Sequence, residues 1–288
     1  MMGSTNFYSN GAFEGRPHNS VDEFFHEHSQ YWKDVYQADT LSAVIYRARR
    51  CAVLSMVHNL RLPVRSRILE VGCGAGSTSV ALAEQGYRVN AVDTVEGMLE
   101  LTRQAANEAR VGADLEVSLA DICQLSFPSR HFALALAVGV FAWLEQPRQA
   151  LTELHRVIRA GGYLIITATN SWCFDQILDP LCFPGLRPVR WRIAEALEKS
   201  NVWRRSRPRQ HRYSVKHVDA LLSQAGFRKV AGRTLGFGPF TILKQKLLPN
   251  PWAIKVHRKF QALADRQFPL VRSGGVVYVV LAQKAYLL

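Results

Sequence analysis

The sequence predicts a doubly wound α/β fold, in which a mostly parallel sheet carries helices on both faces. Between residues 67 and 169, short apolar segments alternate with segments of helical periodicity, which is the order of strands and crossover helices in a parallel sheet. A glycine-rich turn at Gly72–Gly76 separates the first strand-like segment from the first helix-like one. The length of 288 residues and the 48% of apolar residues suffice for a large core. These observations exclude a disordered chain, a disulfide-stapled miniprotein and a collagen-like repeat.

The predicted strands are short and apolar. Five of them precede residue 170, at Arg67–Val71, Tyr87–Val92, Leu115–Leu119, Phe132–Val140 and Tyr163–Thr169. The fourth is a continuous apolar run, which is typical of a strand covered on both faces. Two more strands are predicted near the C-terminus, at Phe227–Ala231 and Val276–Ala282.

Helical periodicity predicts helices over residues 20–60 and between the strands. Capping residues predict where these helices begin and end. The expected first residues or caps are Ser77, Thr94, Pro147 and Ser214. The glycines expected to end helices are Gly86, the pair Gly161-Gly162, and Gly226.

Four consecutive parts are expected along the chain. Residues 1–65 would form an N-terminal arm and helical cap, and residues 66–171 the core that carries the glycine-rich turn. Residues 172–212 mix Trp, Phe, Pro and Arg without regular periodicity, and we interpret them as an inserted basic and aromatic lid over a ligand cleft. Residues 213–288 regain periodicity and would complete the core with its last strands.

Cysteine usage and hydropathy indicate the compartment. The five cysteines are odd in number and scattered, without a Cys-x-x-Cys pair, which favours a reducing compartment such as the cytoplasm. We expect no metal site, because His26-x-His28 lacks a second pair of ligands. The polar N-terminus shows no signal peptide, and the longest apolar run, Phe132–Leu144, is too short to span a bilayer as a helix. We therefore expect a soluble protein.

The positive charge is concentrated in one segment. Residues 187–259 contain 18 Lys or Arg and three acids, a net charge of +15, whereas the whole chain carries +13. Such a segment is typical of a surface that meets nucleic acid, an anionic small molecule or carrier, or an anionic membrane, and also of a merely solvated cationic face. A candidate amphipathic helix lies within it, with Trp252, Val256, Phe260 and Leu263 on one face. That face would either lie in a membrane interface or pack on the core.

Polar residues at the ends of the predicted strands indicate a nucleoside site. The turn reads Gly-x-Gly-x-Gly and lacks the Gly-x-Gly-x-x-Gly register of a dinucleotide fingerprint, since its last position holds Ser77. Asp93 ends the second strand, where a carboxylate can accept both ribose hydroxyls. Asp121 ends the third strand and can meet an adenine amino group, with Ile122 beside it for apolar contact. Open α/β sheets bind ligands at this carboxyl edge.

With these features the sequence resembles the class I S-adenosylmethionine (SAM)-dependent methyltransferases, most closely the small-molecule branch typified by quinone and tetrapyrrole methyltransferases. The resemblance implies a Rossmann-like sheet, methyl transfer, and SAM as the cofactor. The matching segments are RILEVGCGAGS (67–77), NAVD (90–93), LAD (119–121), AVGVFAWLEQP (137–147) and LTELHRVIRAGGYLIIT (151–167).

The resemblance also implies which residues bind the cofactor. The glycines would line the methionine moiety, Asp93 would hold the ribose, Asp121 and Ile122 would bind adenine, and Val138 would lie beneath the sulfonium. Tyrosines of the N-terminal helices would close over it. The full set is Glu70, Gly72, Cys73, Gly74, Gly76, Asp93, Thr94, Met98, Asp121, Ile122, Val138, Gly139, Tyr36 and Tyr46.

Aromatic residues near the ends of the fourth and fifth strands are candidates for binding the acceptor. They would suit an apolar or aromatic acceptor, and those after residue 170 could equally form a small core of the insertion. The candidates are Phe141, Trp143, Trp172, Phe174 and Trp191.

Two departures from the family pattern leave the catalytic residues open. Ala133 stands where many relatives carry an acid, and Ala142-Trp143 stands where small-molecule members often carry Glu-His or His-His. Metal-assisted O-methylation is therefore disfavoured. His131, Glu145 and His211 are candidate bases by residue type alone.

We predict a methyltransferase that acts on a small apolar or anionic molecule. No Asn/Asp-Pro-Pro-Tyr/Phe motif follows the fourth strand and no Pro-Cys pair occurs, which disfavours methylation of amino-adenine and of cytosine C5. Two alternatives stay open: an RNA methyltransferase that uses the basic segment, and a cofactor-binding but non-catalytic partner protein.

Overall fold

The computed structural model describes residues 21–180, 182–186, 188–189, 192, 208, 210–243, 245–269 and 271–285. The predicted N-terminal arm, the candidate Trp191 and most of the basic run 204–209 lie outside the described residues. In the described ranges, no helix combines the length and the apolar character needed to cross a bilayer.

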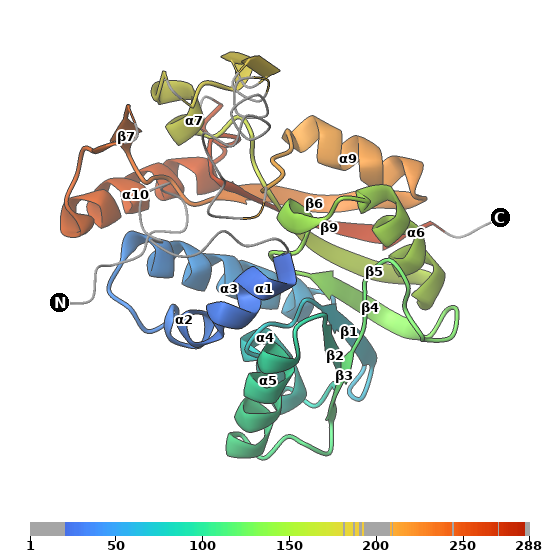
Figure 1. Cartoon of the computed structure of the whole chain (residues 1–288). Coiled ribbons are helices and arrows are strands. Elements are labelled where there is room, and N and C mark those ends of the chain that lie inside the picture. Colours follow the sequence, from blue (N-terminus) through green and yellow to red (C-terminus); the bar gives the residue numbers. More distant parts are fainter. Residues whose placement is uncertain are drawn as a thin grey trace.

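A seven-stranded sheet forms the centre of the molecule, in the order β3-β2-β1-β4-β5-β9-β6 (Figure 1). The first five strands in this order pair in parallel, and β9 is antiparallel to both of its neighbours. The strands are β1 (Arg67–Val71), β2 (Arg88–Asp93), β3 (Leu115–Leu119), β4 (Phe132–Ala137), β5 (Ile158–Thr169), β6 (Phe227–Leu235) and β9 (Val277–Lys284). The predicted doubly wound, mostly parallel sheet is confirmed.

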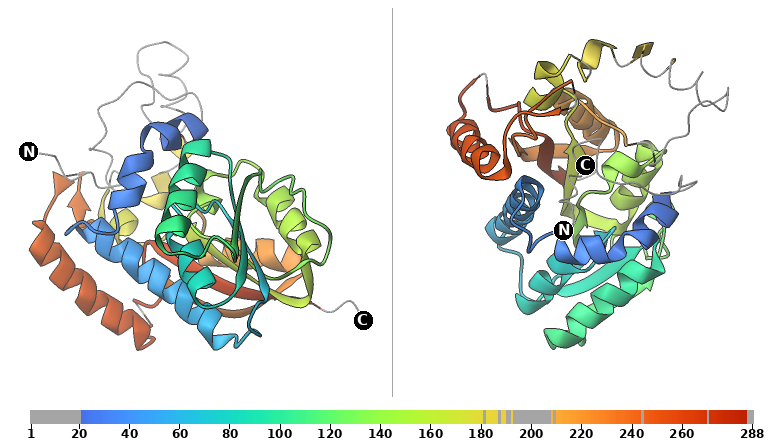
Figure 2. Two further views of the ribbon diagram at one scale, coloured as in Figure 1. Left: turned by 90° about the horizontal axis from the view of Figure 1, so that it is seen from below. Right: turned by 60° about the vertical axis from the view of Figure 1, so that its left-hand side comes forward.

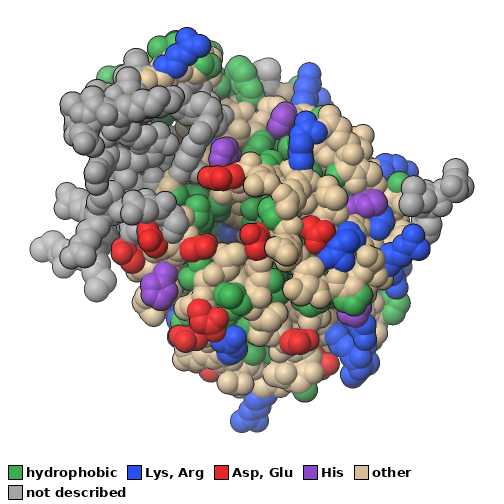
Figure 3. Space-filling view, turned by 45° about the vertical axis from the view of Figure 1, so that its right-hand side comes forward, with side chains coloured by type: hydrophobic (Ala, Val, Ile, Leu, Met, Phe, Trp, Pro, Cys, Tyr) green, Lys and Arg blue, Asp and Glu red, His purple; other side chains and the backbone are tan. Residues whose placement is uncertain are grey.

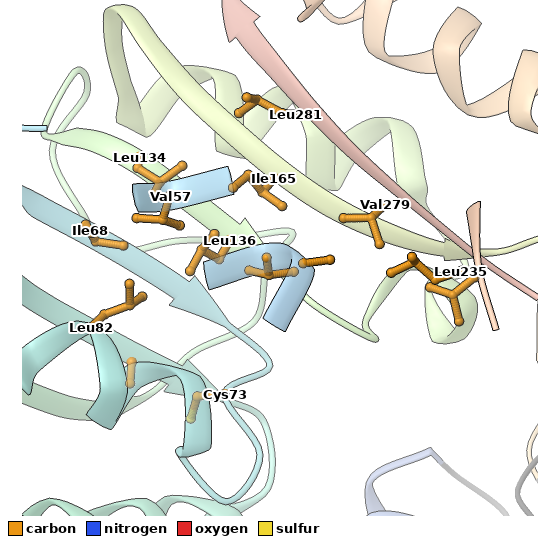
Figure 4. Packing of buried hydrophobic residues seen from close by; sticks show 14 of the residues in the cluster. Val57, Ile68, Cys73, Leu82, Leu134, Leu136, Ile165, Leu235, Val279 and Leu281 are labelled. Carbon is orange, nitrogen blue, oxygen red and sulfur yellow. The ribbon is translucent and has the colours of Figure 1, made fainter. Parts of the chain in front are cut away.

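Helices cover both faces of the sheet and form two apolar layers. One layer packs α3 (Leu41–Asn59), α4 (Ser77–Glu84), α5 (Glu96–Glu108) and α10 (Asn250–Asp265) against the sheet. The other layer packs α6 (Pro147–Val157) and α9 (Val215–Gln224). In the first layer, alternate strand residues such as Ile68, Leu134 and Ile165 point to the helices (Figure 4). This alternation follows from the two-residue period of a strand.

Short elements complete the structure at the carboxyl edge of the parallel strands and beyond it (Figure 2). Two N-terminal helices, α1 and α2, contact α5. A small aromatic cluster joins Phe174, Phe237, Phe240 and Phe260. The short elements are α1 (Val21–Glu27), α2 (Ser29–Asp34), η1 (Phe141–Trp143), α7 (Phe174–Leu178), η2 (Pro184–Leu186), β7 (Thr241–Ile242) and β8 (Gln245–Lys246).

Several predicted helix boundaries differ from those observed. Gly76, not Ser77, is the N-cap of α4, with a left-handed φ of 77° that suits glycine. The helix α5 begins at Glu96 rather than at Thr94. The helix α6 ends at Val157, and the pair Gly161-Gly162 lies within β5, because that strand begins to pair with β4 at Ile158. The expected cap of α9 is confirmed: the Ser214 hydroxyl accepts a hydrogen bond from the His217 N–H at 3.2 Å.

Candidate functional site

A cavity of about 660 Å³ lies at the carboxyl edge of the parallel strands. Its walls come from the turn after β1, the ends of β2, β4 and β5, and the segment after β3. The N-terminal helices and η1 complete it on the outer side. This is the edge at which the sequence predicts a ligand.

The glycine-rich turn gives the cavity a floor of bare backbone. Gly72 has a φ of 66°, and a Cβ there would clash with a methyl group of Val140. Gly74 has a φ of 55°, and a Cβ there would meet nothing within 4 Å. Its carbonyl accepts a hydrogen bond of 2.7 Å from the Thr102 hydroxyl. The turn therefore leaves open space into which a ligand can approach the backbone closely.

Asp93 is held in place by the same turn. Its Oδ2 accepts a hydrogen bond from the Gly74 N–H at 2.9 Å, and its Oδ1 accepts one from the Val95 N–H at 3.1 Å. Burial raises the pKa of Asp93 above its ordinary value, while these backbone N–H groups oppose the rise. Because a carboxylate offers about four lone-pair positions, Asp93 keeps the capacity to accept a hydrogen bond from a ligand as well.

The other predicted cofactor residues divide between the cavity wall and the layer behind it. Those that line the cavity are Gly72, Cys73, Gly74, Asp93, Thr94, Met98, Asp121, Ile122, Val138, Gly139, Tyr36 and Tyr46. Glu70 and Gly76 are not among the lining residues. Glu70 is buried and accepts a short hydrogen bond from the Ser79 hydroxyl, and Gly76 packs against Thr102. Both therefore support the turn from behind.

Asp121 and Ile122, the residues predicted to bind adenine, differ in burial. Asp121 is exposed, and its Oδ1 accepts a hydrogen bond of 2.7 Å from the Cys123 N–H. Ile122 is buried and lines the cavity beside it. A polar acceptor and an apolar surface thus lie side by side after β3.

An aromatic wall covers the outer side of the cavity. It consists of Trp143, Phe25, Trp32, Tyr46 and Tyr36, all of which line the cavity. Neighbouring ring centroids in this order are 5.2, 5.4, 5.8 and 6.3 Å apart. The wall brings together η1, α1, α2 and α3. The sequence predicted Tyr36, Tyr46 and Trp143 as site residues, but it did not predict Phe25 of α1 or Trp32 of α2.

The charges that line the cavity are mostly negative. Asp22, Asp93, Asp121 and Glu145 line it, and Arg49 is the only Lys or Arg among the described lining residues. The uneven distribution extends to the surface, where Figure 3 shows carboxylates gathered in the middle of one face and most cations toward its margins. Negative potential of this kind favours a cationic ligand over a polyphosphate.

Arg49 occupies a defined place in the cavity. Its guanidinium carbon lies 4.9 Å from the centroid of the Tyr46 ring, one helical turn away on α3. Its Nη1 would lie 3.1 Å from a Cβ on Gly139, so the cation rests against the backbone at the end of β4. Arg49 was not among the residues predicted from the sequence, although its spacing of three residues from Tyr46 places both on one helix face.

The three candidate bases are dispersed in the structure. His131 precedes β4 at the opposite edge of the sheet, next to the Arg67 guanidinium. His211 donates its backbone N–H to the Ala142 carbonyl at 2.6 Å and is not among the lining residues. Glu145 is exposed and lines the cavity. Among the described lining residues there is no histidine.

The candidate acceptor residues are dispersed as well. Trp143 lines the cavity, whereas Phe141 is fully buried in the core behind it. Trp172 is half exposed and contacts Phe183, and Phe174 packs in the separate aromatic cluster with Phe260. Phe141, Trp172 and Phe174 therefore do not line the cavity. Across the described ranges, no cluster of three or more His, Cys, Asp or Glu side chains could hold a metal ion.

Comparison with known proteins identifies methyltransferases. Residues 69–166 match the family described as "Methyltransferase domain". A malonyl-[acyl-carrier protein] O-methyltransferase of Enterobacter lignolyticus (strain SCF1) is 34% identical over 183 residues, which cover 62% of this chain and 70% of that protein. A demethylmenaquinone methyltransferase of Clavibacter sepedonicus is 40% identical over 102 residues, or 35% of this chain and 40% of that protein. Over several other curated relatives, the match spans only 27% to 42% of their length.

Solved structures share the fold. Magnesium protoporphyrin IX methyltransferase (ChlM) from Synechocystis PCC 6803 with bound SAH superposes with a TM-score of 0.60, covering 92% of this chain and 98% of that chain. The two sequences are 15% identical, so the similarity concerns the architecture. The family match begins within β1 and extends through most of β5, and these are the strands whose ends form the cavity.

Proposed function

The chain belongs to the class I SAM-dependent methyltransferases, and from this premise we propose that it transfers the methyl group of SAM to a small apolar or anionic acceptor in the cavity described above. When bound, SAM supplies a methyl group already activated by its sulfonium centre. The protein then has to bind, orient and desolvate the two reactants.

The geometry around Asp93 carries this proposal. The Gly74 N–H, which would face a phosphate in a dinucleotide site, is hydrogen-bonded to the Asp93 carboxylate. Four carboxylates line the cavity, and they would repel a pyrophosphate and attract a sulfonium cation. These carboxylates and the occupied Gly74 N–H therefore suit SAM better than a nicotinamide dinucleotide.

We expect different residues of the cavity to contact different parts of SAM. Asp93 would accept the ribose hydroxyls, and Asp121 with Ile122 would hold adenine. The open backbone at Gly74 would take the methionine moiety, and Gly139 would lie near the reacting carbon. The N–H of Gly139 already donates to the Thr167 hydroxyl at 2.7 Å, which fixes the backbone at the end of β4.

The cavity wall favours an acceptor with both apolar and anionic parts. The aromatic wall offers stacking surface, and Arg49 offers a planar cation for a carboxylate. A hydroxyl acceptor needs a base, whereas a carboxylate is already ionised at neutral pH and needs only to be positioned. Of the three candidate bases only Glu145 lines the cavity, and an already ionised acceptor such as a carboxylate would not need it.

Calorimetry with purified protein tests the cofactor assignment. We expect the wild type to bind SAM and its demethylated product, SAH. We expect Asp93→Ala to lose at least about tenfold in affinity, because charged hydrogen bonds are worth roughly 1.5–3 kcal/mol each. Glu100→Ala, which removes an exposed carboxylate from α5, is the matched control and should bind normally. Wild-type protein that binds NAD⁺ and neither SAM nor SAH would overturn the proposal.

The acceptor is identified by incubating the protein with methyl-labelled SAM and fractionated extract, and locating the label by mass. Label in a small apolar or anionic molecule supports the proposal. Label in RNA would favour the alternative based on the basic segment. SAM binding without turnover on any fraction would favour a non-catalytic partner protein.

A further inference from the structure

A second surface of the molecule exposes large apolar side chains at one end of the fold. It is formed by α7, the hairpin of β7 and β8, and α10, and we call it the α7–α10 surface. Its exposed apolar residues, with their exposed fractions, are Ile177 (40%), Leu178 (61%), Ile242 (46%), Leu243 (56%), Leu247 (54%) and Trp252 (60%). Soluble surfaces rarely gather so many large apolar groups without a partner.

Buried contacts hold the three elements of this surface together. Asp179, just after α7, is fully buried; its Oδ2 accepts the Thr241 hydroxyl at 3.0 Å and its Oδ1 accepts the Leu243 N–H at 3.1 Å. The rings of Phe240 and Phe260, 6.2 Å apart, join the hairpin to α10. Figures 1 and 2 show the three elements on the same side of the molecule. These contacts connect α7, the hairpin and α10 into one surface.

The helix α10 does not bury its largest apolar residue. Its buried face consists of Ala253, His257 and Ala264, with Phe260 half-buried in the aromatic cluster. The stripe predicted from the sequence thus only partly packs on the core. Trp252 at its start stays in solvent, with the Lys255 ammonium 4.8 Å from its ring centroid.

Exposed cations accompany the apolar groups on the hairpin and on α10. Lys246, Lys255, Arg258 and Lys259 are all exposed on the hairpin and on α10. Within the described parts of α7, the hairpin and α10, the exposed side chains include only one acid, Asp265, at the far end of the helix. Asp175 and Asp179 are buried and occupied by hydrogen bonds, so they do not offset this charge at the surface.

We propose that the α7–α10 surface docks on an anionic lipid bilayer. The apolar residues of the hairpin and Trp252 would enter the headgroup region, and the lysines and Arg258 would face the anionic headgroups. Exposed apolar side chains, a tryptophan and several cations on neighbouring elements are features that bind a protein in the plane of a membrane interface. The surface lies outside the cavity, so this docking does not depend on the methyltransferase proposal.

Flotation of the full chain with lipid vesicles tests this docking. The anionic vesicles contain equal parts of phosphatidylglycerol and phosphatidylcholine, and the neutral vesicles contain phosphatidylcholine alone. We expect the protein to bind anionic vesicles and to lose most of that binding in neutral vesicles or at high salt, because the headgroup attraction is screened. Failure of the wild type to bind anionic vesicles would overturn the proposal.

Surface variants separate docking from unspecific adhesion. Two double variants should each weaken vesicle binding by about tenfold or more. One combines Leu243→Ser with Leu247→Ser. The other combines Lys255→Glu with Lys259→Glu, since each basic residue near the surface adds about 1 kcal/mol. The matched control is Val64→Ser combined with Val230→Ser, which are exposed elsewhere in the fold and should bind normally. Equal loss in the control, or vesicle binding that survives both variant pairs, would overturn the assignment. Displacement from vesicles by RNA, together with tighter binding to RNA than to lipid, would also overturn it.

Discussion

Arg49 stands out at the scale of single residues, because it sets a positive group among carboxylates. Asp22, Asp93, Asp121 and Glu145 line the same cavity, so a ligand carboxylate would be repelled from most of its wall. The guanidinium against the Tyr46 ring is the place where such a group would be accepted. Two groups compete for it in our proposal: the carboxylate of the methionine moiety and a carboxylate of the acceptor.

Replacing Arg49 distinguishes these two carboxylates. Arg49→Met removes the cation and should weaken binding of the carboxylate that it holds by about tenfold or more, while Arg49→Lys should retain part of it. If Arg49 holds the carboxylate of the acceptor, Arg49→Met should raise KM for the acceptor and leave the calorimetric Kd for SAM unchanged. If Arg49 holds the carboxylate of the methionine moiety, the variant should raise the Kd for SAM. Arg88→Met, an exposed arginine on β2, is the control. Unchanged values of both constants in Arg49→Met would show that the guanidinium binds neither carboxylate.

At the scale of elements, a buried carboxyl joins β1 to α4. Glu70 is 2% exposed and accepts the Ser79 hydroxyl from the helix that follows the glycine-rich turn. Burial raises the pKa of Glu70 from 4.5 to about 7, with the Ser79 hydrogen bond and the nearby Arg50 opposing the rise. The folded state therefore keeps a proton on Glu70 at pH values where the unfolded state has released it.

This raised pKa predicts stability that falls as the pH rises. Between pH 4.5 and about 7 the folded state binds more protons at Glu70 than the unfolded state does, so the free energy of unfolding decreases across that window. A shift of this size corresponds to about 3 kcal/mol. Glu70→Gln mimics the protonated form and should flatten this part of the curve, as measured by denaturant unfolding from pH 5 to pH 8. Burial also raises the pKa of Asp175 to about 7, so Asp175 should leave a residual slope in the stability curve of the variant. An unchanged curve in Glu70→Gln would contradict the prediction.

The cap of α9 gives a second prediction at this scale. Ser214→Ala removes the hydroxyl that accepts the His217 N–H and should lower the free energy of unfolding by about 1 kcal/mol. Ser223→Ala, on the exposed side of the same helix, is the matched control and should leave stability within a few tenths of a kcal/mol. Equal effects in thermal or denaturant unfolding would mean that the cap contributes nothing.

Element boundaries were predictable where local chemistry decides them. Ser214 could be identified as a cap because its hydroxyl acts within one turn of helix. The pair Gly161-Gly162 could not be placed, because long-range pairing of β5 with β4 draws these glycines into the strand. Trp252 shows the same limit: helical periodicity defines its face, but only packing decides whether that face is buried.

At the scale of the whole molecule, the sequence predicted the part of the cavity lining that comes from the ends of the strands. Asp93, Asp121 and the glycine-rich turn could be found because parallel strands end at one edge. Asp22, Phe25 and Arg49 could not be assigned, since they reach the cavity only when the N-terminal helices fold back over that edge. A hydrogen bond of 2.7 Å from the Thr94 hydroxyl to Asp22 shows how α1 is joined to the end of β2.

A ligand in this cavity would bridge the N-terminal helices and the sheet, so binding should stabilise the whole fold. At a SAH concentration about 100 times its Kd, linkage contributes roughly 2.7 kcal/mol, or a rise in Tm of about 5–10 °C for a domain of this size. Differential scanning calorimetry should show this rise with SAH and none with NAD⁺ at the same concentration. The rise should shrink by at least about half in Asp93→Ala, which would lose the proposed ribose contact, and persist in Glu100→Ala. Hydrogen exchange should slow in α1 and α2 as well as at the glycine-rich turn, because both sides of the cavity close on one ligand. Protection confined to the turn would mean that the N-terminal helices do not take part in binding.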